Sequence, residues 1–279
     1  MKYVFFGTPQ FAGIILQGLI DAGMPPVALV CNPDKPFGRK KLIMPPLTKQ
    51  IAQKYGIKIF QPETKGDLAS LSPALSDEAQ LGVVAAYGKI IPQGVIESFK
   101  LGIIGVHPSL LPKFRGPSPI QSAILSGESK TGITLFMLTK GVDDGPILCQ
   151  GEEEIDGKNY EELIEDLGRS SLKLLTKTLP DFDSMKMNAT PQNEAEATLT
   201  SFFKNDAGLV NEDDLKNTLN GDEEKALKIE RMVRALNPEP GVYSFINGKR
   251  TKILSVRRDG SKLVLERIQK DGKTPETLI

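Results

Sequence analysis

The stretch Tyr3-Val4-Phe5-Phe6-Gly7-Thr8-Pro9 decides the fold, because an apolar run passes through a glycine turn directly into a helical pattern. The first 150 residues repeat this alternation of short apolar runs and periodic, helix-like stretches. Several runs are apolar without a polar alternate, which is typical of parallel strands covered on both faces. The sequence therefore predicts an α/β fold: a doubly wound, mostly parallel sheet whose ligand crevice lies beyond the carboxyl ends of its strands.

The elements of this first domain follow from the apolar runs and their spacing. We expect strands at residues 3–6, 27–31, 57–60, 82–86, 103–106, 131–138 and 146–154, and helices at 11–22, 47–55, 117–126 and 160–179. Together they define a domain over residues 1–180. The following residues lose periodicity and become polar, so we expect a linker over 181–199.

A smaller, β-rich second domain is expected over residues 200–279. Its expected elements are a helix at 223–236 and short strands at 241–246, 252–256 and 262–268. The strands are joined at Asn247-Gly248 and Asp259-Gly260, and both dipeptides are strong hairpin turns.

Composition excludes several classes of protein. Cys31 and Cys149 are too few for a disulfide framework and are not spaced as zinc ligands, so we expect a reducing, cytoplasmic setting and no metal site. No apolar run is long enough to cross a bilayer, so we expect no membrane partner. Thirty-five basic residues against 35 acidic ones argue against non-specific coating of nucleic acid, although a local basic patch stays possible.

The first glycine turn is weak evidence for a ligand. Gly7-Thr8-Pro9 lacks the G-x-G-x-x-G spacing that brings a pyrophosphate to a helix N-terminus, so a dinucleotide is disfavoured. The exposed amides of the turn could still bind an anion or a small polar group. A plain strand-to-helix turn explains the segment equally well.

Any imidazole chemistry depends on His107, the only histidine in the sequence. It lies at the carboxyl end of an expected strand, where this architecture gathers ligands. A glycine-bracketed acidic loop, Gly141-Val142-Asp143-Asp144-Gly145, follows another expected strand. Aspartates in such a loop usually serve the turn itself, because Asp bonds its own backbone. The functional interpretation is that one of them meets His107 and fixes its tautomer.

Two basic segments stand out on a chain of zero net charge. Five basic residues and one acid lie between Asp34 and Lys49, in a loop punctuated by proline and glycine. Such a loop near the crevice can track phosphates, and a solvated surface loop is the alternative. The second basic run consists of Lys249, Arg250, Lys252, Arg257 and Arg258, on expected strands whose alternate residues could form a stripe.

Longer motifs add a resemblance that covers nearly the whole chain. The segments that carry it are Gly7-Thr8-Pro9, the basic loop after Asp34, Ala86-Tyr87-Gly88-Lys89-Ile90, His107 with Ser109-Leu110-Leu111-Pro112 and Arg115-Gly116, Pro119-Ile120-Gln121, Gly141-Val142-Asp143, Arg231-Met232-Val233-Arg234-Ala235-Leu236-Asn237-Pro238, Pro240-Gly241 and Gly248-Lys249-Arg250. Together they resemble the folate-dependent formyltransferases, and the second-domain motif narrows the likeness to the methionyl-tRNA formyltransferase family. The resemblance implies a Rossmann-like catalytic domain joined to a small C-terminal OB-like β-barrel that contacts tRNA.

The resemblance also implies a reaction and a site. It implies that 10-formyltetrahydrofolate donates a formyl group to the α-amino group of methionyl-initiator tRNA, for translation initiation. The family's catalytic asparagine, histidine and aspartate fall on Gly105, His107 and Asp143. Folate contacts are expected at Tyr87, Gly88, Lys89, Ile90, Ser109, Leu110, Leu111 and Pro112, and tRNA contacts at Lys35, Arg39, Lys40, Lys41, Lys249 and Arg250. Residues 119–121 are expected to wall the methionine pocket, and we expect the protein to act as a monomer.

Gly105 departs from the family pattern, because glycine has no side-chain amide. A tetrahedral oxyanion develops when an amine attacks the formyl carbon, and one oxyanion donor typically contributes about 10²–10³ in rate. A neighbouring side chain or an ordered water could replace the amide. The imidazolium of His107, held by Asp143, could instead carry more of the charge, or the protein could be a weak or inactive relative. We favour the first two interpretations because the other matching positions are intact.

Three other functions fit parts of the pattern. An N-formyltransferase acting on a nucleotide-linked amino sugar would keep the donor and the core, but the basic loop favours RNA as acceptor. A formylfolate hydrolase would use water as acceptor and would leave that loop without a purpose. A non-catalytic, impaired folate- or tRNA-binding relative is supported by Gly105 alone.

Overall fold

The computed structural model describes residues 1–37 and 42–278, which form two compact units. The first unit comprises Met1–Gly116, Thr131–Glu153 and Ile164–Leu199. The second comprises Pro117–Lys130, Glu154–Leu163 and the segment that begins at Thr200. Each unit therefore gathers segments that are far apart in the sequence.

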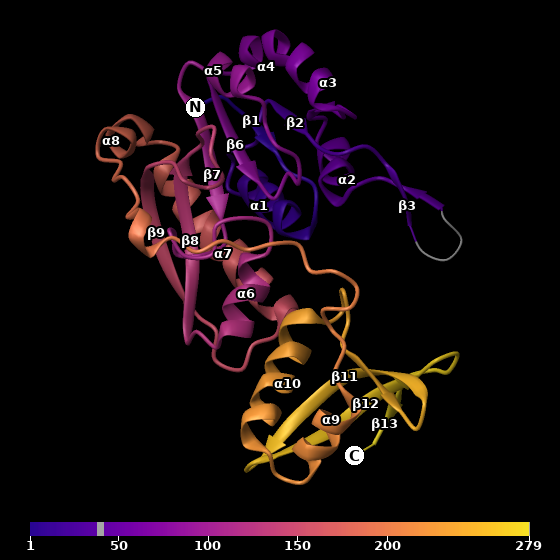
Figure 1. The fold of residues 1–279 in the computed structure, drawn as a ribbon. Helices are drawn as coiled ribbons and strands as arrows, with labels where there is room; N and C mark the ends of the chain where they lie inside the picture. Colours follow the sequence, from indigo (N-terminus) through magenta and orange to yellow (C-terminus); the bar gives the residue numbers. More distant parts are fainter. Residues whose placement is uncertain (38–41, 279) are drawn as a thin grey trace. The chain divides into compact units, whose positions relative to one another are not determined.

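The first unit is built on a seven-stranded sheet in the order β5-β2-β1-β6-β7-β8-β9 (Figure 1). The strands are β1 (Tyr3–Phe6), β2 (Ala28–Val30), β5 (Lys58–Phe60), β6 (Leu81–Ala85), β7 (Gly102–His107), β8 (Lys130–Met137) and β9 (Ile147–Glu154). β5, β2, β1, β6 and β7 pair in parallel, whereas β8 runs antiparallel to β7. The predicted Rossmann-like, mostly parallel sheet is confirmed.

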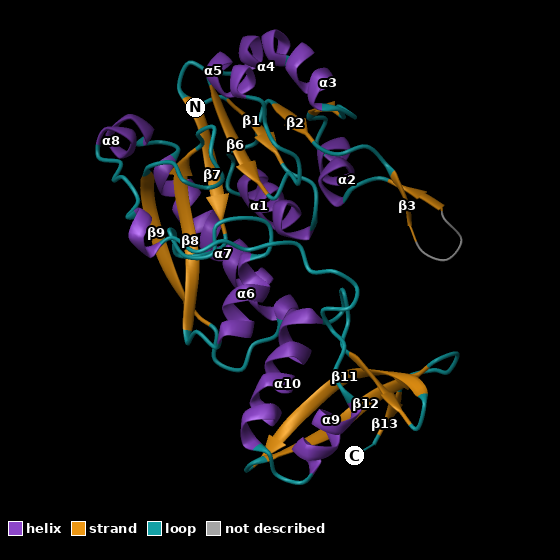
Figure 2. Cartoon of the chain, viewed as in Figure 1, coloured by secondary structure: helices purple, strands orange, loops and turns teal. Residues whose placement is uncertain are grey.

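Helices cover this sheet, as Figure 2 shows. The helices are α1 (Gln10–Asp21), α2 (Leu47–Lys54), α3 (Lys65–Ser70), α4 (Ser72–Glu78), α5 (Gln93–Ser98), α7 (Tyr160–Thr178) and α8 (Phe182–Met187), and the unit also holds the exposed 3₁₀ turn η1 (Glu194–Glu196). On one face, Val4 and Phe6 of β1 pack with Leu68 and Leu75 of α3 and α4. Because these strand residues are fully buried, the sheet forms the centre of the core.

The strand order reverses between β1 and β6, which makes the carboxyl ends of these strands the switch point of the sheet. Gly7 follows β1 directly. A Cβ at this position would lie 2.6 Å from the Cβ of Ala12 and 2.8 Å from the carbonyl oxygen of Ala85. The glycine in the first turn is therefore required by close packing at the crevice.

The second unit combines helices with a small antiparallel sheet in the order β10-β11-β12-β13. Its elements are α6 (Pro119–Ser126), α9 (Glu212–Leu219), α10 (Glu223–Leu236), β10 (Tyr243–Ile246), β11 (Lys249–Asp259), β12 (Lys262–Lys270) and β13 (Glu276–Thr277). Asn247 and Gly248 both have positive φ, 51° and 72°, as a two-residue hairpin turn requires. The β-rich second domain is thus present as a four-stranded sheet with β10 and β13 at its edges.

Several segments differ in detail from the predicted elements, and α9 and β13 of the second unit were not predicted. The basic loop contains two short strands, and β3 (Lys35–Phe37) pairs antiparallel with β4 (Leu42–Met44). The segment expected to be a linker holds α8 and η1. The short helices α3, α4 and α5 were not predicted, because six or seven residues are too few for a clear helical period.

Candidate active site

Polar groups at the ends of three strands are bonded to one another at the switch point. The Asn32 amide nitrogen donates to Thr8 Oγ1 (3.1 Å), and its side-chain Nδ2 donates to the Tyr87 carbonyl (3.1 Å). Within the part of the chain that the structure describes, Asn32 Oδ1 and the Tyr87 hydroxyl are buried without a hydrogen-bond partner. Burial raises the pKa of Tyr87 to about 12, so this hydroxyl stays neutral at physiological pH.

His107 is the last residue of β7 and is 6% exposed. Its Nε2 donates to the carbonyl of Phe114 (2.8 Å), and its Nδ1 lies 3.5 Å from Asp143 Oδ2. Both neighbours can only accept hydrogen bonds, and only the imidazolium form donates from both ring nitrogens. Each ring nitrogen of His107 therefore faces an acceptor.

Asp143, not Asp144, is the aspartate that meets His107. Its backbone has a φ of +50°, and its Oδ2 accepts a hydrogen bond from the Gly116 amide (2.8 Å). A left-handed backbone favours Asp and Asn among residues with a side chain. Asp144 is exposed and accepts a hydrogen bond from the Thr139 hydroxyl. The acidic loop thus divides its two carboxylates between the histidine and the turn.

Phe136 covers Gly105. The two residues are direct cross-strand partners in the antiparallel pair of β7 and β8. A Cβ built on Gly105 would lie 2.2 Å from Cε1 and 2.4 Å from Cζ of the phenyl ring. Gly105 and His107 share a face of the strand, because side chains alternate along it. An aromatic ring therefore fills the space in which a longer side chain at position 105 would stand.

Sequence reasoning missed Gln192, Glu194 and Thr198, which lie in the segment expected to be a linker. Buried Arg115 donates to both carboxylate oxygens of Glu194 (3.0 and 2.7 Å) and twice to Gln192 Oε1 (3.0 and 2.9 Å). The hydrogen bonds between them lower the pKa of Glu194 and raise that of Arg115. Arg115-Gly116 is one of the segments that carry the family resemblance, but no sequence pattern indicates the partners of Arg115.

The residues expected to contact folate fall into two groups. Ser109 is fully buried and donates to the Lys113 carbonyl (2.6 Å), and Leu111 is 3% exposed, so both shape the loop. Lys89 Nζ donates to the carbonyls of Pro62 and Glu63 (2.7 and 2.9 Å). Ile90, in contrast, is 67% exposed. Tyr87 and Gly88 lie at the end of β6, and Leu110 and Pro112 are half-buried in the loop after His107.

The expected tRNA contacts lie in both units. Lys35 is exposed on β3, whereas Arg39, Lys40 and Lys41 lie outside the described residues. On the small sheet, Lys249 is exposed and the Arg250 guanidinium lies 4.0 Å from the centroid of the Tyr243 ring.

The small sheet combines these basic groups with aromatic rings. Tyr243 pairs with Lys252 and Phe245 with Arg250 across β10 and β11, so the four side chains share one face. Thr251 and Ile253 occupy the opposite, buried face. The exposed face therefore offers two aromatic rings and two cations.

The second-domain motif has a structural role. The Arg231 guanidinium lies against Gly127, the C-cap of α6, where an added Cβ would stand 2.1 Å from Arg231 Cζ. Arg234 Nη1 donates to the Lys158 carbonyl (2.9 Å). Because cations stabilise the carbonyl end of a helix, Arg231 anchors α10 against α6.

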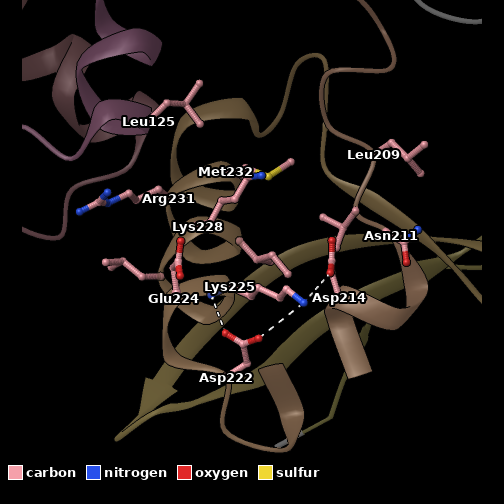
Figure 3. Close-up of a pocket in the computed structure, with 13 residues that line it drawn as sticks. Leu125, Leu209, Asn211, Asp214, Asp222, Glu224, Lys225, Lys228, Arg231 and Met232 are labelled. Atoms are coloured by element: carbon pink, nitrogen blue, oxygen red, sulfur yellow. Dashed lines mark hydrogen bonds and ion pairs between the residues drawn. The ribbon is translucent and has the colours of Figure 1, made fainter. Parts of the chain in front are cut away.

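The second unit also contains a pocket of about 440 Å³, shown in Figure 3. Leu125, Leu209 and Met232 form part of its apolar lining. Lys225 reaches across the pocket to Asp214 (2.9 Å) and Asp222 (3.5 Å), so its ammonium is already bound by protein carboxylates.

The described residues contain neither a metal-binding cluster nor a membrane-spanning helix. No group of three or more His, Cys, Asp or Glu side chains among them could hold a metal ion. None of the helices that the structure describes is long and apolar enough to cross a membrane.

Comparisons with known proteins agree on one family. A model described as "Formyl transferase" matches residues 1–180, and one described as "Formyl transferase, C-terminal domain" matches residues 223–277. The chain is 37% identical to the methionyl-tRNA formyltransferase of Chloroflexus aggregans over 256 residues, which are 91% of this chain and 80% of that protein.

Solved structures show the same fold. The methionyl-tRNA formyltransferase from Clostridium thermocellum has a TM-score of 0.59 at 17% identity, covering 97% of this chain and 98% of that one. HypX from Aquifex aeolicus in complex with tetrahydrofolic acid has a TM-score of 0.65 at 13% identity over 100% of this chain. The chain spans about half of HypX, 46% of its length. The family models and the sequence identity show that this chain belongs to the formyl transferase family, in the group of the methionyl-tRNA formyltransferases.

Proposed function

We propose that the protein transfers the formyl group of 10-formyltetrahydrofolate to the α-amino group of methionyl-initiator tRNA, giving N-formylmethionyl-tRNA. The observation that carries this proposal is the near full-length identity to methionyl-tRNA formyltransferases, 37% over 91% of the chain. His107 and Asp143, which meet beside the end of β7, supply the catalytic groups. Residues 1–180 would form the catalytic domain, residues 181–199 would link the two domains, and residues 200–279 would contact tRNA.

The chemistry requires few groups from the protein. An α-amino group has a pKa of about 8, so a good part of it is already nucleophilic at neutral pH. Its nitrogen attacks the formyl carbon, and the carbonyl electron pair moves to the oxygen. Collapse of this intermediate breaks the bond to the folate nitrogen, which leaves with the proton that the amine loses. The protein must orient the two substrates, relay that proton and stabilise the oxyanion.

His107 is the group to which we assign oxyanion stabilisation. The space above Gly105 holds the phenyl ring of Phe136, which has no hydrogen-bond donor. His107 lies two residues further on the same strand face and is flanked by two acceptors. To replace an amide as the donor to the oxyanion, the Nε2–H of His107 would exchange the Phe114 carbonyl for the oxyanion, while Nδ1 stays beside Asp143.

The folate would lie at the switch point of the sheet. Tyr87, Gly88, Lys89 and Ile90 rim it at the end of β6, and Ser109, Leu110, Leu111 and Pro112 belong to the loop after β7. The unpartnered Asn32 Oδ1 adds an acceptor that a pteridine N–H can satisfy, because buried acceptors are seldom left unpaired. The neighbouring Ile90 offers an exposed apolar surface for the ring system.

Transfer to charged tRNA is tested in a single-turnover assay. With 10-formyltetrahydrofolate and methionyl-initiator tRNA we expect N-formylmethionyl-tRNA, and we expect no transfer to nucleotide-linked amino sugars. Transfer to an amino sugar alone would assign the protein to the sugar formyltransferases. Release of formate without transfer would indicate a hydrolase, and binding without turnover would indicate a folate- or tRNA-binding protein.

The basic and aromatic face of the small sheet is the proposed tRNA contact of the second domain. Aromatic rings stack with bases, and cations pair with phosphates. We expect Arg250→Ala to weaken binding of initiator tRNA and to reduce the slope of log Kd against log salt by about one. Arg257→Ala is the matched control, because Arg257 lies 3.8 Å from Asp259 on the same strand and 3.8 Å from Glu266 on β12. Equal salt slopes for Arg250→Ala and the unchanged protein would disprove this contact.

A further inference from the structure

Residues 190–199 attach to both loops of the candidate active site, and we call this segment the strap. At one end, Thr190 pairs with Ile147 through two backbone hydrogen bonds (2.7 and 2.9 Å). At the other end, Thr198 accepts from the Arg115 amide (2.9 Å) and donates to the Pro112 carbonyl (3.3 Å). The strap therefore lies along the loop that follows His107 and beside the strand that follows Asp143.

Gln192 is the residue of the strap that holds the aspartate loop. Its Nε2 donates to the carbonyls of Asp143 and Gly145 at 2.8 Å each. Its Oε1 accepts twice from Arg115, whose side chain is 5% exposed. One amide group thus satisfies two carbonyls on one loop and a buried cation on the other.

Thr198 holds the histidine loop in a similar way. Its Oγ1 accepts from the Phe114 amide (2.8 Å), and the Phe114 carbonyl accepts from His107 Nε2 (2.8 Å). Phe114 has a φ of +61°, which is uncommon for a bulky residue and needs support from its surroundings. The hydrogen bonds that join Thr198 to the Phe114 amide, the Arg115 amide and the Pro112 carbonyl supply that support.

We propose that Gln192 is a positioning residue, which fixes Asp143 against His107 by holding the backbone of the aspartate loop to Arg115. Asp143 itself has a φ of +50°, so its carboxylate keeps its direction only while the loop is held. The 3.5 Å separation between Asp143 Oδ2 and His107 Nδ1 is set by this connection. The proposal rests on the proposed formyl transfer for its kinetic consequence, but its geometry is independent of the substrate.

The test uses Gln192→Glu in the full chain. A glutamate keeps acceptors for Arg115 but has no N–H for the carbonyls of Asp143 and Gly145. We expect kcat to fall about 10- to 100-fold with both KM values within twofold, because small misplacements of catalytic groups act on the chemical step. His107 is the only histidine, so the ring signals of a histidine-labelled sample without an affinity tag report on it alone. Those ring resonances are expected to shift in the variant.

Asn193→Ala is the matched control, because Asn193 bonds only to Ala195 and Glu196 within the strap among the contacts described. It should keep kcat and the His107 resonances of the unchanged protein. If Gln192→Glu does not fold, Gln192→Met removes the same donors without adding charge and is measured in its place.

Each outcome decides the proposal. Unchanged kcat and unchanged His107 resonances in the folded variant would overturn it, and so would a lower kcat with unshifted resonances. If the unchanged protein transfers no formyl group to tRNA, the proposed function fails. The resonance comparison still tests the role of Gln192 in that case.

Discussion

Replacing His107 with alanine is expected to slow formyl transfer about 10²- to 10³-fold, the contribution of one lost oxyanion donor. We assign stabilisation of the oxyanion to this ring, and the chain contains no second histidine that could replace it. The loss should appear in kcat, because His107 is 6% exposed and contributes little surface to substrate binding. Single-turnover formation of N-formylmethionyl-tRNA measures it directly.

The aspartates of the same loop provide a matched pair of variants for this prediction. Asp143→Asn keeps the left-handed backbone and an acceptor for the Gly116 amide but removes the charge beside His107. We expect it to share most of the His107→Ala loss. Asp144→Asn changes the exposed neighbour that accepts from Thr139 and should leave the rate unchanged. Equal activity of the Asp143 and Asp144 variants would contradict the assignment of Asp143 as the carboxylate that acts with His107.

Gly105→Asn is expected to destabilise the protein by roughly 2–5 kcal/mol, although it introduces the asparagine that the family resemblance implies at this position. The new Cβ would stand 2.2 Å from a ring carbon of Phe136, which is 2% exposed and cannot move aside without opening the core. The asparagine amide would also be pressed against an aromatic face. Urea unfolding monitored by circular dichroism measures the loss of stability.

The double variant Gly105→Asn/Phe136→Ala separates packing from chemistry. Phe136→Ala alone should cost roughly 3–5 kcal/mol, the usual price of an emptied aromatic site. The two substitutions together should be less destabilising than their sum by about 1–3 kcal/mol, since the asparagine enters the vacated space. We expect the folded double variant to formylate within about tenfold of the unchanged protein, because His107 already serves as donor. A gain on the order of 10²-fold, the contribution of one oxyanion donor, would instead indicate an impaired natural site.

The sheet and the histidine–aspartate pair were predictable because each depends on local patterns. Apolar runs such as residues 3–6 mark buried strands, and the carboxyl ends of such strands meet at one edge. His107 and Asp143 each follow or end a strand, so their meeting follows from topology. Which of two adjacent aspartates faces the histidine depends on one backbone angle, and that angle is not encoded in the local pattern.

The strap was not predictable from sequence for a different physical reason. Residues 180–198 are polar and aperiodic, which is typical of a connector, and their hydrogen bonds reach residues about 80 positions away. Gln192 is an ordinary surface residue by type, and its role comes from its bonds to the buried Arg115 and to the carbonyls of the aspartate loop. The covering of Gly105 by Phe136 is similarly a cross-strand contact between residues 31 positions apart in the sequence.

The pairing of Gly105 with Phe136 also restricts which substitutions these two positions can accept during evolution. A side chain at position 105 is excluded while the phenyl ring is present, and loss of the ring first leaves a void over the glycine. Either order of substitution therefore passes through a less stable intermediate. Selection for a folded protein keeps the two positions as a unit, so a lineage that acquires this pair is held to a site in which the imidazole works without a neighbouring amide.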